Sequence, residues 1–378
     1  MIDLPSRIAR GDAEPPPDLL AALGDPPPHA RPPDPDRIAG ALLALAIGDA
    51  LGNTTESRLP HERRAQHGEI RDYLPNRRAN GRRVGLPSDD TQLAFWTLEH
   101  VLEHGRVVPD RLAATFADGR RIFGLGRTVR AFLERYEEGA AWHEAAQRSA
   151  GNGAVMRIAP VIVPHLERPT TALWRDAILA GAVTHNDASS IAACVAVTGL
   201  VWDALAMSRP PEPRWWLDRY VALARPIEGD AELEPRGGTI AGSFRGPIWR
   251  LVETEVASAL DADLDVRTAG QRWYSGAFLL ETMPTVLHIL ARHADDPEEA
   301  IVRAVNDTRD NDTIAAIVGA VVGALHGRAA LPRRWADGLV GRTRESDDGR
   351  VCELIDRALA HVEAGKQPTI SSRPRSGE

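Results

Sequence analysis

Apolar residues recur along this chain at the three- and four-residue spacing of a helix face, in long segments separated by glycine and proline. Runs that are rich in β-branched residues and alternate with a period of two are nearly absent. The pattern therefore predicts an all-α protein. The clearest helical faces are Leu93, Trp96, Leu98, Val101 and Leu102; Ala177, Leu179, Ala180 and Val183; and Ile191, Val195, Thr198, Val201 and Trp202.

Several of these segments are rich in alanine and glycine, as at Gly319, Ala320, Gly323 and Ala324. Small side chains let two helix backbones approach closely. We therefore expect a compact orthogonal helical bundle.

Composition divides the chain into three parts. Residues 1–35 contain two PPP runs and one PPDP, which predicts an extended N-terminal segment without regular structure. The helical domain is expected to cover residues 36–364. Inside it, residues 209–249 break the helical pattern and are predicted to form an irregular insertion that covers a site or contacts a partner. Residues 365–378 are predicted to be a disordered tail.

The bulk composition excludes some classes of function. A hydrophobic share of 43% and a charged share of 26% are those of a soluble globular protein, and the net charge of −8 argues against binding to a nucleic acid duplex. Only two cysteines, Cys194 and Cys352, fit a reducing cytoplasm. The first residues lack the apolar core of a secretory signal, and the runs ALLALAI and IAAIVGAVVGAL are shorter than the roughly 20 residues that span a bilayer. We therefore expect a cytoplasmic protein without a membrane partner.

Two short acidic clusters carry the strongest chemical signal. They are SDDT at 88–91 and DNDT at 310–313, and each opens a long apolar-periodic segment. Folding could bring two helix N-termini to one point and so gather an all-oxygen ligand set for hard divalent cations. The alternative is ordinary helix N-capping, which Asp, Ser and Thr favour. The candidate metal ligands are Ser88, Asp89, Asp90, Asp310, Asp312 and Thr313.

Other candidates are weak when taken singly. Glu56 follows GDALGNTT and matters only if its loop meets the acidic clusters. The Gly151-Asn152-Gly153 turn, expected to run into an apolar helix, could offer backbone N–H groups to an anion or could be a plain turn. A second glycine-containing loop spans 123–128, and His185 in THND precedes a predicted helix. The sequence contains no GxSxG motif and no GKS-type phosphate loop.

Six motifs taken in order resemble the ADP-ribosylglycohydrolase family over roughly residues 37–362. They are GALLALAIGDALGNTTE, SDDTQLAFW, GNGAVMRIAP, THND, SGAFLLETMPTVL and NDTRDNDTIAAIVGAVVGALHG. The resemblance implies a compact all-α bundle with two Mg²⁺ or Mn²⁺ ions at the base of a cleft. It also implies a hydrolase that removes ADP-ribose from a modified protein side chain, commonly arginine.

The resemblance further implies roles for particular residues. One ion would be held by Ser88, Asp89, Asp90 and Asp312. The other would be held by Asp310, Asp312 and Thr313, with Asp89 also near it, so that Asp312 bridges the two ions. Glu56, or a metal-bound aspartate such as Asp89 or Asp312, would transfer the proton. The residues implied to line the substrate cleft are Phe123, Gly124, Gly126, Gly151, Asn152, Gly153, His185, Ser275 and Gly276.

The chain departs from the family pattern at two places. Ser88 stands where threonine is usual, and Arg309 adds a guanidinium beside the second cluster, which leaves the acceptor open between arginine and serine or another O-linked residue. A different class of function is an immunity protein whose residues 1–35 insert into the cleft of an ADP-ribosyltransferase toxin. A third alternative is a relative without catalysis, which the intact ligand set argues against.

Overall fold

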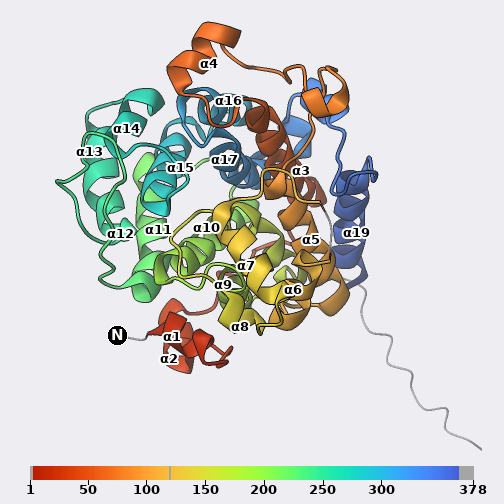
Figure 1. Ribbon diagram of the computed structural model, residues 1–378, viewed down its shortest axis with the longest axis vertical. Coiled ribbons are helices and arrows are strands. Elements are labelled where there is room, and N and C mark those ends of the chain that lie inside the picture. Colours follow the sequence, from red (N-terminus) through yellow and green to blue (C-terminus); the bar gives the residue numbers. More distant parts are fainter. Residues whose placement is uncertain (1–2, 119–120, 366–378) are drawn as a thin grey trace, which may run out of the picture.

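The computed structural model of the protein describes residues 3–118 and 121–365 (Figure 1). These residues form helices joined by loops, with isolated β-bridges but no strand, so the predicted all-α class is confirmed. The α-helices are α1 (Leu4–Ala9), α2 (Pro17–Leu23), α3 (Pro35–Gly52), α4 (Pro60–His67), α5 (Asp89–His104), α6 (Pro109–Phe116), α7 (Arg127–Glu137), α8 (Trp142–Ala145), α9 (Ala172–Ala182), α10 (Ala188–Ala206), α11 (Pro213–Glu228), α12 (Ile248–Leu251), α13 (Ala257–Asp261), α14 (Val266–Trp273), α15 (Leu279–His293), α16 (Pro297–Asp307), α17 (Asn311–His326), α18 (Arg333–Gly338) and α19 (Arg350–Gly365).

Short 3₁₀ turns and one π-helical turn complete the element list. The 3₁₀ turns are η1 (Asn53–Thr55), η2 (Arg77–Ala79), η3 (Val155–Arg157), η4 (Ala159–His165) and η6 (Arg328–Ala330), and the π-helical turn is η5 (Val252–Val256). The apolar segment after the Gly-Asn-Gly turn was expected to be an α-helix, and this was wrong. It forms η3 and η4 instead, because Pro160 and Pro164 lack the N–H groups that a continuous α-helix needs.

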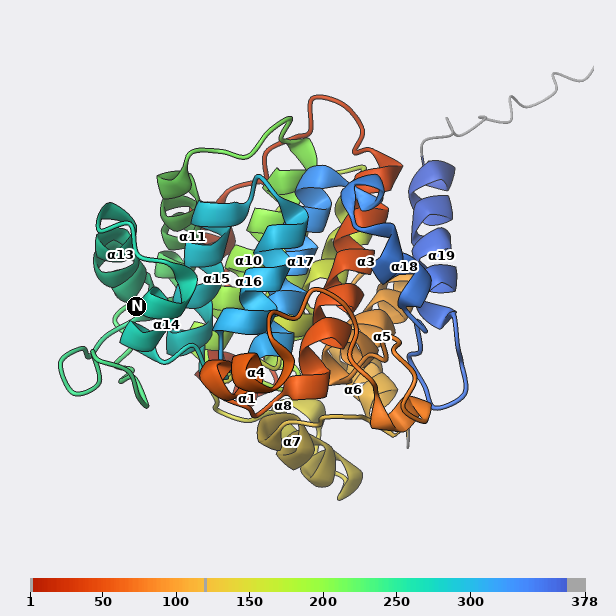
Figure 2. The same cartoon turned by 90° about the horizontal axis from the view of Figure 1, so that it is seen from above.

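Helices α3 and α17 pack side by side at the centre of the molecule (Figure 2). A Cβ atom placed on Gly48 would lie 2.2 Å from the carbonyl oxygen of Ala315, and one on Gly52 would lie 2.4 Å from the Cα of Asp312. On the other helix, a Cβ on Gly323 would lie 2.2 Å from the carbonyl oxygen of Gly40. The two backbones touch, which confirms the expected close approach at Gly319 and Gly323.

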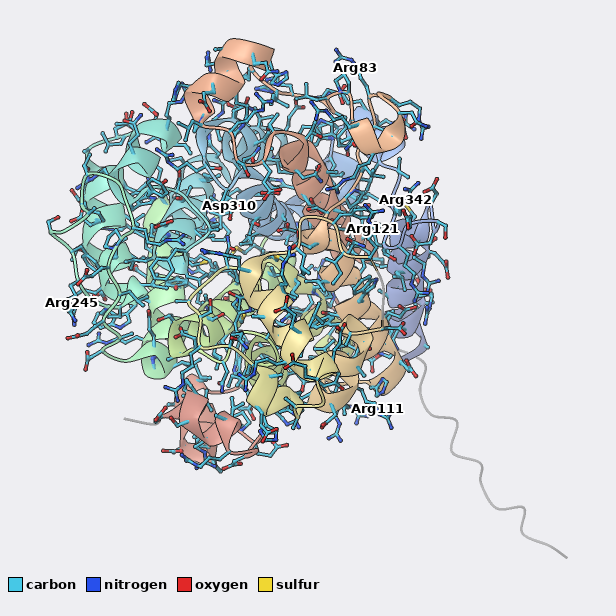
Figure 3. The ribbon with its side chains drawn as sticks, viewed as in Figure 1. Arg83, Arg111, Arg121, Arg245, Asp310 and Arg342 are labelled. Atoms are coloured by element: carbon cyan, nitrogen blue, oxygen red, sulfur yellow. The ribbon has the colours of Figure 1, made fainter. Side chains whose placement is uncertain are left out.

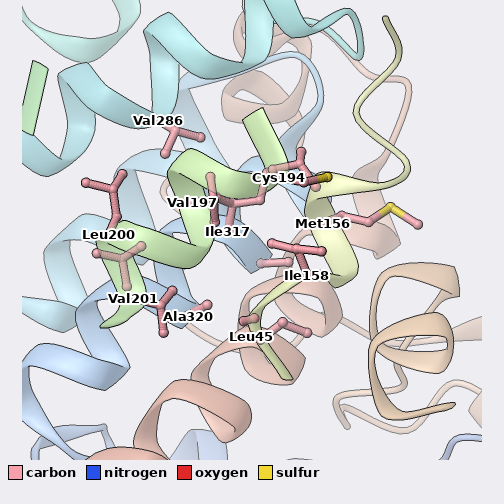
Figure 4. Close-up of a cluster of buried hydrophobic side chains, with 14 of the residues drawn as sticks. Leu45, Met156, Ile158, Cys194, Val197, Leu200, Val201, Val286, Ile317 and Ala320 are labelled. Atoms are coloured by element: carbon pink, nitrogen blue, oxygen red, sulfur yellow. The ribbon is translucent and has the colours of Figure 1, made fainter. Parts of the chain in front are cut away.

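The hydrophobic core surrounds this central pair. Helix α10 packs against α17, and Val197 and Leu200 of α10 lie in a cluster with Ile317 and Ala320 of α17 (Figure 4). Leu45 of α3 joins the same cluster, so three helices that are far apart in the sequence share one core. The core holds the ends of α3, α5 and α17 in fixed positions, and the polar clusters of the sequence lie at those ends.

The N-terminal segment is ordered and packed, so the expected extended structure for residues 1–35 was wrong. Its two short helices, α1 and α2, place Leu4, Ile8 and Leu19 in the hydrophobic core. The indole N–H groups of Trp174 and Trp202 donate to the carbonyl oxygens of Gly24 and Pro27, at 2.7 and 2.9 Å. The prolines set turns and helix starts, while α1 packs against α8 and α2 packs against α9 and α11.

Residues 209–249 are only partly irregular. Helix α11 occupies 213–228 and buries Trp216, Tyr220 and Leu223. The proline at its first position and the glycine that follows its last residue mark the helix ends. Its apolar face is difficult to recognise in the sequence, because tryptophan and arginine residues are interspersed along it. The irregular part is residues 229–247. The predicted disordered tail lies outside the described residues, apart from Gly365 at the end of α19.

Two helices are longer and more apolar than the sequence runs indicated. Pro35–Thr55 and Ala188–Ala206 have mean hydropathies of 1.3 and 1.6 and are long enough to cross a bilayer by length and composition alone. Core helices of globular proteins have the same composition, and 89% of each apolar window is buried inside this molecule. We interpret both as core helices.

Replacing Gly48 by alanine should destabilise the protein by about 1–3 kcal/mol, because the new methyl group overlaps the Ala315 carbonyl and forces α3 away from α17. Thermal and urea unfolding measure the loss. Gly126→Ala is the matched control, since no heavy atom lies within 4 Å of its added Cβ. Equal stability of the Gly48→Ala and control variants would show that the contact between α3 and α17 is not rigid.

Candidate active site

A cavity of about 460 Å³ opens where the N-termini of α5 and α17 meet. We call it the acidic cavity, because five carboxylates line it. Asp310 lies near the middle of the view in Figure 3, well inside the ring of labelled surface arginines. The predicted site residues in its lining are Glu56, Asp89, Asp90, Gly124, Gly126, Gly151, Asn152, Gly153, His185, Asp310, Asp312 and Thr313.

Four predicted residues lie outside this lining. Ser88 faces a neighbouring cavity, although its hydroxyl is 3.5 Å from Asp90 Oδ2. Phe123 contributes its backbone, since its carbonyl accepts from the Asp89 N–H at 2.7 Å. Ser275 contacts the start of the second acidic cluster through its backbone, and the Gly276 carbonyl accepts from the Thr282 hydroxyl at 2.7 Å. The structure therefore places residues of both acidic clusters in one cavity lining, and Ser88, Phe123, Ser275 and Gly276 lie outside that lining.

Asp49 organises the SDDT cluster. It is fully buried on α3, and its carboxylate accepts from the backbone N–H of Ser88 at 2.8 Å and of Thr91 at 3.1 Å. It also accepts from the hydroxyls of Ser88 and Thr91, at 2.6 and 2.5 Å. Because the Ser88 hydroxyl donates its hydrogen bond to Asp49, the lone pairs of its oxygen remain available to accept from or coordinate another partner. The sequence reasoning gave Asp49 no role, because the only sign of its importance in the sequence is that it is a lone charged residue inside an apolar helix.

The DNDT cluster is held from below and from the side. The carbonyl of Ser275 accepts from the N–H groups of Arg309 and Asp310, both at 3.1 Å, in a turn where Ser275 has a φ of 48°. The side-chain amide of Asn152 donates to the Asp310 carboxylate. Asn311 points the other way and donates to the Gly52 carbonyl at 2.9 Å, which ties α17 to the end of α3.

Helix capping does not account for the two clusters. Ser88 and Asp310 are the N-cap residues of α5 and α17, but neither side chain accepts a capping hydrogen bond from its own helix. By contrast, Asp187 caps α10 by accepting from Ser189 and Ser190 at 3.0 and 3.3 Å. The hydroxyls of Ser88 and Thr91 donate to Asp49 instead, and the four aspartates of the two clusters line the acidic cavity.

The carboxyl groups of the acidic cavity are buried close together, and electrostatic repulsion between neighbours raises their pKa values. Burial, followed by the charges of Asp49 and Glu56, raises the pKa of Asp89 to about 8. Burial and the neighbouring carboxylates also raise the pKa values of Asp90 and Asp312 far above the ordinary range. Asp90 Oδ1 is buried without a hydrogen-bond partner. Such groups keep their protons or bind cations, because an isolated buried charge is costly.

An all-oxygen donor set with an unpartnered carboxylate oxygen fits hard divalent cations. Within the described residues, however, no three Asp, Glu, His or Cys side chains already stand in the arrangement of a metal-ligand group. The assignment of Ser88, Asp89, Asp90, Asp310, Asp312 and Thr313 to two ions therefore stays a prediction. The fit rests on the chemistry of the oxygens and on their shared cavity.

Glu56 lies on the rim of the acidic cavity. It follows η1, whose Thr55 hydroxyl accepts from Asn311 at 3.1 Å, so the turn that carries Glu56 is tied to α17. The residue as a whole is exposed. Partial burial of its carboxyl group raises its pKa, and the charges of Asp310 and Asp49 add to the effect. A carboxyl group with a raised pKa beside an opening is suited to proton transfer.

The loop from Phe123 to Thr128 forms one wall of the cavity. Gln92 of α5 holds it, since its side chain accepts from the Phe123 N–H at 2.8 Å and donates to the Arg121 carbonyl at 3.0 Å. Gly124 has a φ of 87°, and a Cβ there would lie 2.7 Å from Asp89 Oδ1. Any larger residue would therefore push against the first acidic cluster.

His185 reaches the cavity as the end of a buried hydrogen-bond chain. Arg157 Nη2 donates to the Thr184 hydroxyl at 2.8 Å, and that hydroxyl contacts His185 Nδ1 at 2.8 Å. Burial and the Arg157 charge lower the pKa of His185 to about 3, so its ring is neutral. We infer that Thr184 donates to Nδ1, which leaves the proton on Nε2 and makes His185 a hydrogen-bond donor toward the cavity.

The sequence reasoning missed Arg236 in the lining and included Arg127 only as part of the glycine-containing loop at 123–128. Arg236 extends from the irregular residues 229–247 and forms a paired ionic contact with the buried Glu281, with Nη2 3.0 Å from Oε2. Arg127 begins α7 at the same cavity. Only the irregular character of residues 229–247 pointed to this region, and nothing in the sequence distinguished Arg236 from the other arginines of the chain.

Comparison with known proteins decides the family. The model of the ADP-ribosylglycohydrolase family matches residues 30–368, which is most of the chain. The chain belongs to the ADP-ribosylglycohydrolase family. Similar relatives include the ADP-ribosyl-(dinitrogen reductase) glycohydrolase of Rhodospirillum rubrum, 28% identical over 79% of this chain and 89% of that protein. An ADP-ribosylarginine hydrolase of Pseudomonas putida is 26% identical over 80% of this chain and 74% of its own length.

A solved structure agrees with this assignment. An ADP-ribosylglycohydrolase-related protein complex superposes with a TM-score of 0.62 and 25% identity, and the match covers 87% of this chain and 98% of the other. The ADP-ribosylglycohydrolase fold predicted from the six motifs is therefore confirmed. Membership of this family makes the protein a hydrolase that acts on ADP-ribose.

Asp49→Ala should remove the acceptor of two buried N–H groups, cost about 1–3 kcal/mol of stability for each group left unsatisfied, and loosen the SDDT turn. We expect the variant to fold and to lose its thermal response to added Mg²⁺ or Mn²⁺, measured by differential scanning fluorimetry. The matched control is Asp265→Ala, which removes the N-cap of α14 at about 1 kcal/mol. A control that loses the metal response as well would contradict a specific role for Asp49.

Proposed function

We propose that the protein is a metal-dependent hydrolase that removes ADP-ribose from modified protein side chains, arginine in particular. The observation that carries the proposal is the convergence of two acidic helix N-termini on one cavity, where Asp90 Oδ1 has no partner and the carboxylates are not neutralised. The names of the relatives support arginine as the acceptor, since one is an ADP-ribosylarginine hydrolase.

The residues present would hold two Mg²⁺ or Mn²⁺ ions. Ser88, Asp89, Asp90 and Asp312 would hold one, and Asp310, Asp312 and Thr313 the other, so that Asp312 is shared. When bound, such ions supply fixed positive charge for ribose hydroxyls and for a water molecule. Binding would also relieve the repulsion that raises the pKa values of these carboxyl groups.

The side chains of the cavity supply the remaining chemistry. The bond between the anomeric carbon of the ribose and the acceptor nitrogen breaks as the oxygen of water forms a new bond to that carbon, through a transition state with oxocarbenium character. Glu56 or Asp89 takes a proton from the water, and the leaving guanidine gains one. His185 donates from Nε2 and Arg127 offers a guanidinium, and both groups suit the oxygens of the ADP-ribose diphosphate.

The immunity hypothesis was based on an extended N-terminal segment, and the structure shows this segment to be helical and packed. A segment that inserts into the cleft of a toxin must be free, whereas residues 3–35 are packed onto the same chain through Leu4, Ile8 and Leu19. Toxin binding through the N-terminal segment stays a prediction without structural support. We therefore propose hydrolysis alone, with an ADP-ribosylated protein as the partner.

Metal removal tests the first half of the proposal. EDTA should abolish release of ADP-ribose, and Mg²⁺ or Mn²⁺ at 100 times its dissociation constant should stabilise the folded protein by about 2.7 kcal/mol. Asp312→Ala should remove both responses and lower turnover by several orders of magnitude, because a shared ligand holds two ions. Ser88→Ala removes one neutral ligand and should cost less.

Two outcomes would contradict this half. One is full turnover by the metal-free protein. The other is near-normal turnover by a folded and metal-loaded Asp312→Ala variant, which would place the reaction elsewhere.

The second half concerns the acceptor. We expect release of ADP-ribose from an arginine-modified protein at least tenfold faster than from the same protein modified on serine, measured as free ADP-ribose by chromatography with the wild-type enzyme and Asp312→Ala as the blank. Faster release from serine would assign the enzyme to O-linked substrates, and Arg309, whose guanidinium lies 4.1 Å from the Tyr274 ring centre, would then be the first residue to replace.

A further inference from the structure

A second cavity adjoins the acidic cavity. It has a volume of about 470 Å³, and the two cavities share Glu56 and Gly124 in their linings. We call it the basic cavity, because Arg58, Arg77 and Arg78 line it together with His67. Ser88 faces this side of the shared wall, while the next residue, Asp89, faces the acidic cavity.

The arginines of the basic cavity are not engaged in ion pairs. Across the described residues, no carboxylate lies within salt-bridge distance of Arg58, Arg77 or Arg78, and all three residues are exposed. By contrast, the nearby Arg71 pairs with three glutamates. Arg58 contacts the side chain of Gln66, and the Arg78 guanidinium lies 4.6 Å from the Phe123 ring centre. Arg58 and Arg78 are therefore oriented by neutral neighbours and keep their charges available.

The walls of the basic cavity are fixed. On one side, Asn76 accepts from the Arg78 N–H at 2.9 Å through its side chain and from the Gly81 N–H at 2.9 Å through its carbonyl, which closes the turn that carries Arg77. On the other side, α4 is anchored by the fully buried Arg63, which donates to the carbonyls of Val305 and Thr308 at 2.6 and 3.0 Å. An ordered frame of this kind presents charges at little entropic cost.

The position of the basic cavity limits what can occupy it. In the proposed reaction the scissile bond lies at the carboxylates of the acidic cavity, and Glu56 and Gly124 separate these carboxylates from the basic cavity. We therefore assign the acceptor side of the bond to the basic cavity. A diphosphate does not need the basic cavity, because the acidic cavity has its own guanidinium group in Arg127. Three unpaired arginines repel a basic peptide and attract carboxylates.

We propose that the basic cavity is an acceptor subsite that selects modified side chains flanked by aspartate or glutamate. The proposal rests on the proposed hydrolase function. It adds a substrate class to that function: acidic segments of ADP-ribosylated proteins. A nucleic acid is the less favoured polyanion, because the chain as a whole carries a net charge of −8 and would repel an extended phosphate backbone.

The test compares two peptides that carry ADP-ribosylarginine, one flanked by glutamates and one by glutamines, by their values of kcat/KM. We expect wild type to prefer the glutamate peptide by about tenfold, and the preference to shrink in 0.5 M salt. In Arg58→Gln/Arg77→Gln the ratio of the two kcat/KM values should fall to about one. The control Arg111→Gln/Arg357→Gln makes the same change of charge at exposed arginines of α6 and α19 and should keep the ratio; Arg111 lies at the lower edge in Figure 3.

A binding measurement separates this proposal from the hydrolase function. A fluorescent glutamate peptide without ADP-ribose should bind wild type and the control, and bind Arg58→Gln/Arg77→Gln about tenfold more weakly by anisotropy. If neither modified peptide is hydrolysed but this pattern of binding holds, the hydrolase function fails and the acidic subsite stands.

Four results would overturn the subsite. The first is an equal kcat/KM of wild type for the two modified peptides, and the second is an equal fall in kcat/KM for both peptides in Arg58→Gln/Arg77→Gln. The third is tighter binding of a single-stranded oligonucleotide than of the glutamate peptide, and the fourth is the absence of both hydrolysis and peptide binding. The second result would assign the arginines to ADP-ribose itself.

Discussion

The contact between the backbones of α3 and α17 is the constraint on which the site depends. At Gly48 and Gly52 there is no room for even a methyl group, so the last turns of α3 rest directly on the first turns of α17. That contact sets Asp49 beside one acidic cluster and Asp312 within the other. A helix pair held apart by larger side chains would have an interaxial distance of 8–10 Å, typical of ordinary packing, and would separate the two clusters.

Close packing also explains how the molecule tolerates so much buried negative charge. The carboxylate of Asp49 is satisfied by two backbone and two hydroxyl donors from the SDDT turn, so it behaves as a structural acceptor. The carboxyl groups that face the cavity have far fewer donors, and burial raises their pKa values. Buried carboxylate oxygens therefore have hydrogen-bond donors behind the cavity wall and lack them at the wall itself, as at Asp90 Oδ1. Beyond that wall the remaining oxygens are available to a ligand that carries positive charge.

Much of the fold and part of the site follow from sequence because their signals are local. Helical periodicity located α5, α9 and α10, and adjacent acidic and hydroxyl residues marked both clusters. What the sequence did not reveal depends on partners far away in the chain. Asp49 acquires its role only from donors 39 and 42 residues later.

The same reason explains the two misread segments. Residues 3–35 become ordered because Leu4, Ile8 and Leu19 enter the hydrophobic core and because Trp174 and Trp202 donate to backbone carbonyls of this segment. Arg236 gains a fixed position from Glu281, which lies 45 residues away on α15. Proline content describes the local backbone well and says nothing about which apolar side chains find a buried surface. Glu56 and Gly124 are far apart in the chain, yet both line the acidic cavity and the basic cavity and so form the wall between them. In the described part of the chain, carboxylates lie on one side of this wall and unpaired guanidinium groups on the other, and this arrangement of charge arises from the fold because its residues come from separate parts of the chain.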